Sequence, residues 1–257
     1  MLLSPGSKIQ RGQRITAAQA ATLAGVLPAG SLERGERLTP MIVDDFFNGT
    51  SAHTGFVFTA IASGTLAGSA TGVATSHHPG CVTITSSTTT NSGAVVQANA
   101  SAFLIGGGEQ YDCVLKTDAS FANNTMRLGL HDTTSSVDAV DGAYFEVSAT
   151  GVVTAKTSNN SVRTTSATII TMAVNTWYHC RVKVNPTASA VDFTVYSDAG
   201  AVLGTTQITA NIPTVSGREC APQFVATNVG TVATVLVHID YMAFGYQGRT
   251  LIRGALT

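Results

Sequence analysis

The chain has 257 residues, of which 44% are hydrophobic and only 11% are charged, and its formal net charge is −1 at pH 7. A soluble domain usually carries about 25% charged residues, so this composition suits a protein packed against other protein better than a freely diffusing enzyme. No apolar run approaches the roughly 20 residues that cross a bilayer, and the start of the chain lacks the apolar segment of a secretory signal, so we expect no membrane association.

The charges are unevenly distributed along the chain. Residues 1–40 hold five basic and two acidic side chains, residues 41–248 hold seven basic and thirteen acidic ones, and residues 249–257 hold two basic ones. Basic segments at both ends of an acidic body favour contact with an acidic partner surface, although two solvated tails would have the same composition. The candidate partner-binding residues are Lys8, Arg11, Arg14, Arg34, Arg37, Arg249 and Arg253.

Residues 1–43 differ in pattern from the rest and are expected to form an N-terminal docking arm. Residues 16–24 are predicted to form a short helix, because Thr16 and Gln19 make a capping box, alanines follow, and Gly25 ends the run. A helix of about ten residues is not stable alone in water. We therefore expect the arm to be ordered only where it docks on a partner.

From residue 44 onward the hydrophobic pattern has a period of two, which is typical of strands with one buried and one exposed face. The clearest runs are 111–115, 126–131, 178–184, 191–195 and 235–243. The prediction is an all-β fold, an antiparallel jelly-roll sandwich over residues 44–248, followed by a basic C-terminal tail over 249–257. We expect an early strand at Val57-Phe58 to pair with 235–244 and close one sheet.

Residues 76–213 contain an ordered series of short motifs. They are SHHPGCVTI at 76–84, DGAYFE at 141–146, NTWYHCRVKVN at 175–185, VDFTVY at 191–196 and QITANIP at 207–213. In this order they resemble the concanavalin-A-like, laminin-G-like jelly rolls of tailed-phage virion proteins, namely capsid decoration proteins, head fibres and tail fibres. The turn at 197–200 departs from that pattern. The asparagine and acid set of the calcium-dependent lectin members is also not matched.

No metal or cofactor is expected, because no Cys or His residues stand at ligand spacing. Asp132, Asp138 and Asp141 share one predicted loop and are the calcium candidates, since that hard ion needs about six or more oxygen ligands. The four cysteines, Cys81, Cys113, Cys180 and Cys220, are predicted to be buried reduced thiols.

No catalytic residue is expected either. Adjacent Asp44 and Asp45 diverge in an extended segment, whereas a glycosidase needs two carboxylates that face each other. Gly106–Gly108 precede a strand and not a helix, which indicates a plain loop and not a phosphate cradle. Trp177 opens a strong strand, so we expect it in the core and not stacked on a sugar.

The sequence therefore predicts a non-enzymatic phage virion structural protein of the capsid decoration, cement or head-fibre type, attached through its N-terminal arm. Its expected partners are other virion proteins and further copies of itself, with no specific nucleic acid. Its expected location is the virion, assembled in the host cytoplasm. The alternative is a carbohydrate-binding receptor-recognition module of a tail fibre, with a host surface glycan as its ligand.

Overall fold

The computed structural model describes residues 38–44, 56–68, 77–78, 80–98, 103–230 and 236–247. The chain separates into two units, Met1–Arg37 and Leu38–Thr257, and the described residues all belong to the second. The expected helix at 16–24 and the expected basic tail at 249–257 lie outside them. Among the described residues no helix is long and apolar enough to cross a membrane.

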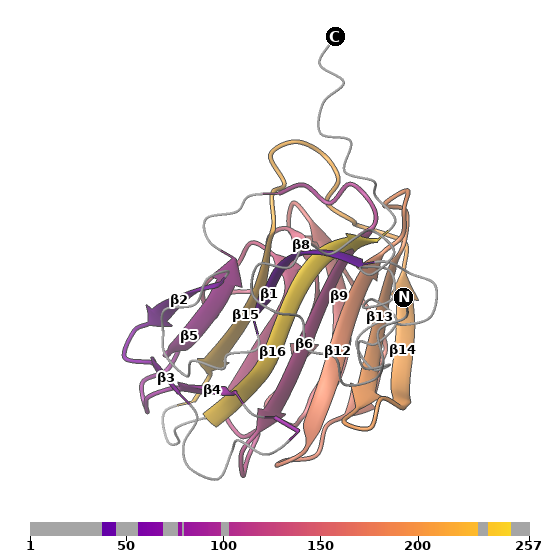
Figure 1. The fold of residues 1–257 in the computed structure, drawn as a ribbon. Coiled ribbons are helices and arrows are strands. Elements are labelled where there is room, and N and C mark those ends of the chain that lie inside the picture. Colours follow the sequence, from indigo (N-terminus) through magenta and orange to yellow (C-terminus); the bar gives the residue numbers. More distant parts are fainter. Residues whose placement is uncertain are drawn as a thin grey trace, which may run out of the picture. The chain divides into compact units, whose positions relative to one another are not determined.

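The described strands of this second unit form two antiparallel sheets of eight strands each (Figure 1). The strands of the first, sheet A, are β1 (Leu38–Asp44), β3 (Thr65–Gly68), β4 (Val82–Thr85), β6 (Glu109–Thr117), β12 (Trp177–Val184), β13 (Val191–Ser197), β14 (Val202–Ile208) and β16 (Leu236–Gln247). Their order is β14-β13-β12-β6-β16-β4-β3, and β1 also pairs with β16. Because β1 begins at Leu38, the sandwich starts ahead of the boundary expected at residue 44.

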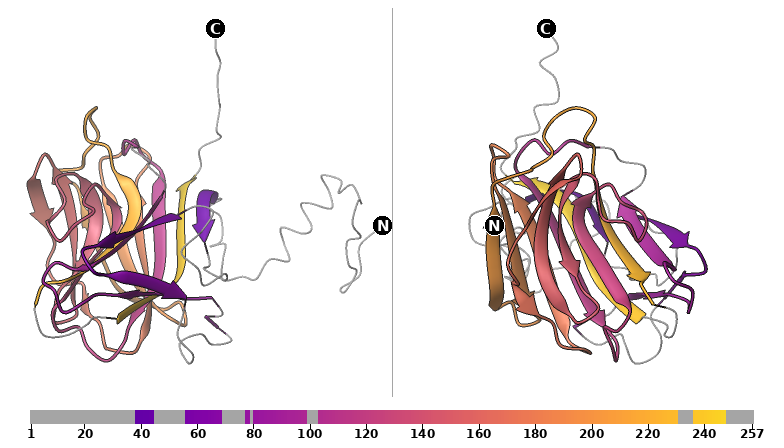
Figure 2. Two further views of the ribbon diagram at one scale, coloured as in Figure 1. Left: turned by 90° about the vertical axis from the view of Figure 1, so that its left-hand side faces the viewer. Right: turned by 180° about the vertical axis from the view of Figure 1, so that it is seen from behind.

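The strands of the second, sheet B, are β2 (Phe56–Ile61), β5 (Gly93–Ala98), β7 (Asn124–His131), β8 (Gly142–Val147), β9 (Val152–Asn159), β10 (Val162–Thr165), β11 (Ile170–Thr171) and β15 (Ala221–Asn228). Their order is β10-β9-β8-β7-β15-β5-β2, with β11 beside β9. Strands β7 to β10 follow one another directly in the chain and in the sheet. The two turned views show the sheets as two layers (Figure 2).

The expected alternation along the strands is confirmed, and with it the all-β jelly-roll sandwich. In β12, Tyr178, Cys180 and Val182 belong to the buried core cluster, so the intervening His179 and Arg181 face outward. The two layers meet through contacts such as that between Phe145 of β8 and Phe193 of β13, whose rings lie edge to face with centroids 5.3 Å apart.

Strand β16 has two different partners along one of its edges. β4 pairs with Leu236–Ile239 and β1 pairs with the stretch from Met242 to Gln247, while β6 occupies the other edge. The register shifts between Ile239 and Tyr241, which places Asp240 in a bulge. The predicted pairing of Val57-Phe58 with this strand is wrong, because β2 pairs with β5 in sheet B.

Candidate functional site

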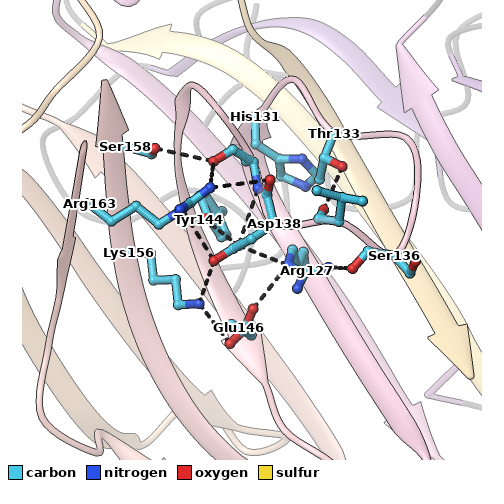
Figure 3. A network of polar contacts seen from close by, with 12 residues as sticks. Arg127, His131, Thr133, Ser136, Asp138, Tyr144, Glu146, Lys156, Ser158 and Arg163 are labelled. Carbon is cyan, nitrogen blue, oxygen red and sulfur yellow. Dashed lines mark hydrogen bonds and ion pairs between the residues drawn. The ribbon is translucent and has the colours of Figure 1, made fainter. Parts of the chain in front are cut away.

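The outer face of sheet B carries a cluster of charged side chains from four neighbouring strands. Arg127 lies on β7, Glu146 on β8, Lys156 on β9 and Arg163 on β10. Neighbouring positions such as Leu128 and Phe145 belong to the core cluster, so the alternation along each strand turns the charged positions outward. With Tyr144 and Asp138 these side chains form what we call the charged network (Figure 3).

Asp138 is the centre of the charged network. It lies on the loop between β7 and β8, and its Oδ1 accepts hydrogen bonds from Arg127 Nε at 3.1 Å and Tyr144 Oη at 2.7 Å. Its Oδ2 lies 2.9 Å from Lys156 Nζ and 3.2 Å from Arg163 Nε. One loop carboxylate is therefore bound by side chains from four adjacent strands, as Figure 3 shows.

Glu146 shares two of these cations with Asp138. Its Oε2 accepts from Arg127 Nε at 3.0 Å and its Oε1 accepts from Lys156 Nζ at 2.8 Å. The network thus holds three cations and two carboxylates. Arg127 is nearly buried, with 8% of its side chain exposed, while Asp138 and Glu146 are 25% and 20% exposed. Both carboxylates therefore remain reachable from solvent.

The surroundings of Asp138 keep it ionised. Burial by itself raises the pKa of this carboxyl, but hydrogen bonds from Lys156 and Tyr144 and the charges of Lys156 and Arg127 outweigh burial and lower the pKa below its usual value. A carboxyl with a lowered pKa is a poor general acid. It is suited to accepting hydrogen bonds and binding cations.

Beside the charged network lie two buried side chains with unsatisfied polar atoms. His131 Nδ1 lies 2.7 Å from Gln223 Nε2, which also donates to the carbonyl oxygens of His131 and Thr133. His131 Nε2 and Gln223 Oε1 have no hydrogen-bond partner among the described residues. Burial, reinforced by the charge of Arg127, lowers the pKa of His131 to about 3, so the ring is neutral.

A second polar cluster lies on the outer face of sheet A, around Asp112 of β6. Its Oδ1 lies 2.6 Å from His179 Nε2 and 2.8 Å from Arg181 Nε, and its Oδ2 accepts from Gln110 Nε2 at 2.6 Å. Burial raises the pKa of Asp112, but the hydrogen bond and charge of His179 and the charge of Arg181 prevail and lower it. Asp112 is almost fully buried, which indicates a stabilising role for this cluster.

Trp177 also lies on the outer face of sheet A. It is buried, but it stacks on His78 with ring centroids 4.1 Å apart, and Lys116 Nζ lies 5.4 Å from its ring centre. Trp177 is thus buried, as expected, but it does not belong to the core cluster between the sheets. Since Tyr178 points into the core, the period of two places Trp177 on the opposite face.

The three calcium candidates have separate protein partners. Asp132 Oδ1 accepts from the Val140 amide, Asp141 Oδ1 accepts from the Asn160 amide, and Asp138 is bound by the cations of the charged network. In the described ranges no three His, Cys, Asp or Glu side chains gather where they would hold a metal ion. The seven candidate partner-binding residues Lys8, Arg11, Arg14, Arg34, Arg37, Arg249 and Arg253 lie outside those ranges.

The glycine triplet binds an anion of its own chain. The amides of Gly106 and Gly107 donate to the two carboxylate oxygens of the buried Glu109, at 3.0 and 2.8 Å. All four cysteines are free and buried, as predicted, and burial raises the pKa of Cys81 to about 12. These thiols are therefore poor nucleophiles.

Sequence reasoning missed the basic half of the charged network and Glu146, although a signal was present. Arg127 lies directly opposite Glu146 in the β7–β8 pair, and Lys156 lies opposite Tyr144 in the β8–β9 pair. Aligning these consecutive strands as hairpins would have placed the charges side by side. The approach of Asp138 depends on the path of the loop, which no periodicity describes.

Comparison with known proteins identifies both a sequence family and structures of the same fold. The family model described as SO2946-like, C-terminal domain, matches residues 77–240. The protein of unknown function SO2946 from Shewanella oneidensis MR-1 is similar over 93% of this chain and 97% of its own, at 18% identity and a TM-score of 0.68. Comparison with curated proteins gives no sequence match.

Two further similar structures come from phages. The CBM2 module of the evolved Dit of Lactobacillus casei BL23 phage J-1 covers 83% of this chain and 98% of its own, with a TM-score of 0.55 and 14% identity. The carbohydrate esterase vb_24B_21 of the Shiga toxin-encoding bacteriophage phi24B covers 82% of this chain and 99% of its own, with a TM-score of 0.53 and 15% identity. At these identities the likeness shows the fold alone.

The expectation that the chain is not an enzyme is corrected by these comparisons. Besides the phage esterase, similar structures include a β-1,3-glucanase from Mycobacterium marinum and the Bacillus licheniformis β-glucanase, each with a TM-score of 0.52. The same sandwich therefore serves hydrolases as well as binding domains. A low content of charged residues does not distinguish the two classes, because a catalytic site needs only a few side chains.

Proposed function

The chain belongs to the family described as SO2946-like, C-terminal domain, and from that premise we propose that its sandwich is a carbohydrate-binding domain of a phage particle. The proposed binding surface is the charged network on the outer face of sheet B. The function proposed from the sequence as the alternative, receptor recognition by a glycan-binding module, thus becomes the first candidate.

The observation that carries this proposal is the convergence of donors and acceptors from β7, β8, β9 and β10 at one partly exposed place. Sugar hydroxyls both donate and accept hydrogen bonds, and the carboxylate of Glu146 accepts while Lys156 and Arg163 donate. Hydrogen bonds to charged groups are roughly twice as strong as those between neutral groups. Side chains fixed by several strands are also preorganised, which lowers the entropy lost on binding.

The test is binding of the full chain to a glycan array, followed by titration of each glycan that binds. Glu146→Gln removes a charged acceptor and should weaken binding about tenfold or more, since a hydrogen bond to a charged group contributes about 1.5–3 kcal/mol. Asp192→Asn is the matched control, because Asp192 lies on β13 of sheet A and accepts from Gln207. It should bind as the natural chain does.

Two results would contradict the proposal: an array without a specific hit, or a hit that Glu146→Gln leaves unchanged. The same glycans should be followed for release of reducing ends, because hydrolases share this fold. Release that is lost in Glu146→Gln would add a hydrolytic step to binding at the same surface.

The second candidate is a structural role, in which the protein fastens to the capsid or tail and to further copies of itself. Leu38 and Gln247 are directly paired in sheet A, so the chain enters and leaves the sandwich at neighbouring points. The two basic segments of the sequence are therefore attached side by side, which favours their joint use on one acidic surface.

Replacing Arg11, Arg14, Arg34 and Arg37 by glutamine tests this attachment. Incorporation into particles should fall and the remaining attachment should become less sensitive to salt, since exposed charges are screened beyond about 8–10 Å at ordinary ionic strength. Unchanged incorporation with unchanged salt dependence would argue against attachment through the basic segment.

A further inference from the structure

The donors around Asp138 all come from the sheet, whereas the carboxylate that they bind comes from a loop. Arg127, Tyr144, Lys156 and Arg163 lie on β7, β8, β9 and β10 and surround the two oxygens of Asp138 at distances from 2.7 to 3.2 Å. Each of these four side chains is held in place by its own strand. The sheet therefore forms a carboxylate cradle, and one residue of the loop fills it (Figure 3).

The charges of the sheet require an anion at this place. Without Asp138, Glu146 is the one carboxylate left for both Arg127 and Lys156, and Arg163 loses its ion pair with Asp138. Arg127 and Lys156 have only 8% and 12% of their side chains exposed. Nearly buried cations are costly unless an anion neutralises them. Any anion that fits the cradle is therefore a competitor of Asp138.

The cradle is flanked by further groups that suit a polar ligand. His131 Nε2 and Gln223 Oε1 are buried and have no hydrogen-bond partner among the described residues. His131 lies on β7, the strand that also carries Arg127 of the cradle. His131 also packs against Tyr144 of the cradle, with ring centroids 5.3 Å apart. Buried polar atoms are nearly always hydrogen-bonded, so these two atoms leave room for a partner such as a water molecule beside the cradle.

We propose that sheet B carries a preformed carboxylate-binding site that Asp138 occupies from within the chain, and that the carboxylate of an acidic saccharide, of the hexuronate kind, binds the same donors. This rests on the proposed function and names its ligand class. The ligand carboxylate takes the place of Asp138 between Arg127, Lys156 and Arg163. The hydroxyls of the saccharide form hydrogen bonds with Glu146 and with neighbouring polar side chains.

The first experiment removes the internal carboxylate and supplies an external one. Asp138→Ala leaves a space of the size of formate or acetate, so the full-length variant should melt lower than the natural chain. Formate, acetate and glucuronate should raise its melting temperature in a saturable way by about 2–4 °C or more, whereas chloride at equal ionic strength should not. Asp192→Ala on sheet A is the control and should show no saturable gain.

Two outcomes overturn the carboxylate site. One is a folded Asp138→Ala whose melting temperature does not respond to carboxylates, and the other is an equal response to chloride, which would be salt screening alone. If Asp138→Ala does not fold, Asp138→Asn keeps the size of the side chain and an acceptor for Tyr144. This variant should bind glucuronate at least tenfold more tightly than the natural chain, and equal binding would refute the proposal.

Glucose beside glucuronate separates this inference from the proposed function. A gain with glucuronate and none with glucose supports the acidic ligand class. If acetate raises the melting temperature of Asp138→Ala but the natural chain binds no glycan, the carboxylate site is supported and carbohydrate binding is rejected. Binding of neutral glycans that Asp138→Asn does not alter would keep the function and reject the acidic ligand.

Discussion

The imidazole of His78 stacks on the indole of Trp177, with ring centroids 4.1 Å apart and ring planes 21° apart. Its Nδ1 lies 2.9 Å from Asp240 Oδ2 and its Nε2 lies 3.0 Å from Asp198 Oδ1. Each of the two ring nitrogens therefore has a carboxylate partner. One side chain thus joins the bulge of β16, the turn after β13 and the first residue of β12.

Replacing His78 by alanine should lower the free energy of unfolding by about 1–3 kcal/mol, because a buried group with two carboxylate partners and an aromatic contact is lost. Urea denaturation measures this change. The neighbouring His77 is exposed, so His77→Ala is a matched control and should stay within about 0.5 kcal/mol of the natural chain. Equal effects of the two substitutions would show that the contacts of His78 contribute nothing to stability.

The low pKa of His131 makes stability depend on pH in a defined direction. The folded chain keeps this ring neutral down to about pH 3, whereas the unfolded chain binds a proton near the ordinary value of 6.5. The contribution of the neutral ring to the free energy of unfolding is therefore fully present above pH 6.5, and it decreases as the pH falls toward 3. Between pH 6 and pH 5 the free energy of unfolding should fall by about 1 kcal/mol from this group.

The variant His131→Gln should lack this part of the decline, while His77→Gln should retain it. Urea denaturation at pH 6 and pH 5 compares the three chains. The carboxyls of Asp112 and Asp138 do not interfere, because their pKa values are held below 3.8 in the folded chain. A decline of the same size in His131→Gln would show that another group takes up the proton.

Gly107 and Gly200 both have positive φ, but only Gly107 is tightly enclosed. A Cβ at Gly107 would lie 2.2 Å from the carbonyl oxygen of Pro186, whereas a Cβ at Gly200 would meet nothing within 4 Å. Gly200→Ala should therefore lower the free energy of unfolding by about 1–2 kcal/mol, because only backbone strain is introduced. Gly107→Ala should lose about 1–3 kcal/mol more in thermal or urea unfolding, because the loop that holds Glu109 must shift. Equal losses would show that this loop yields freely.

The sequence allowed the strands to be predicted, because burial of one face leaves a period of two that a single strand displays by itself. The core positions Tyr178, Cys180 and Val182 followed from that pattern and are confirmed. The same period already determined the face of Trp177. Trp177 was expected to be buried because it opens a strong strand, and it is buried. Tyr178 faces the core between the sheets, however, and His78 covers Trp177 on the outer face of sheet A.

Pairings between distant strands could not be predicted, because many pairings of similar apolar strands satisfy the same pattern. Strand β16 lies between β6 and the pair of β1 and β4, which are separated from it by most of the chain. The carboxylate cradle depends only in part on contacts that the sequence pattern does not reveal. Arg127, Glu146 and Lys156 come from consecutive hairpins, whereas Asp138 reaches them through the fold of its loop.

The pairing of Leu38 with Gln247 has a mechanical consequence. A pull that separates these two ends acts on one hydrogen-bonded pair after another, so β1 peels from β16 like a zipper and yields at low force. A pull on both ends in the same direction drags β16 along β6 instead, and the contacts over most of its length resist together. A sandwich whose two chain ends are anchored to the same support would therefore withstand a tension that unfolds a sandwich whose two chain ends are pulled in opposite directions.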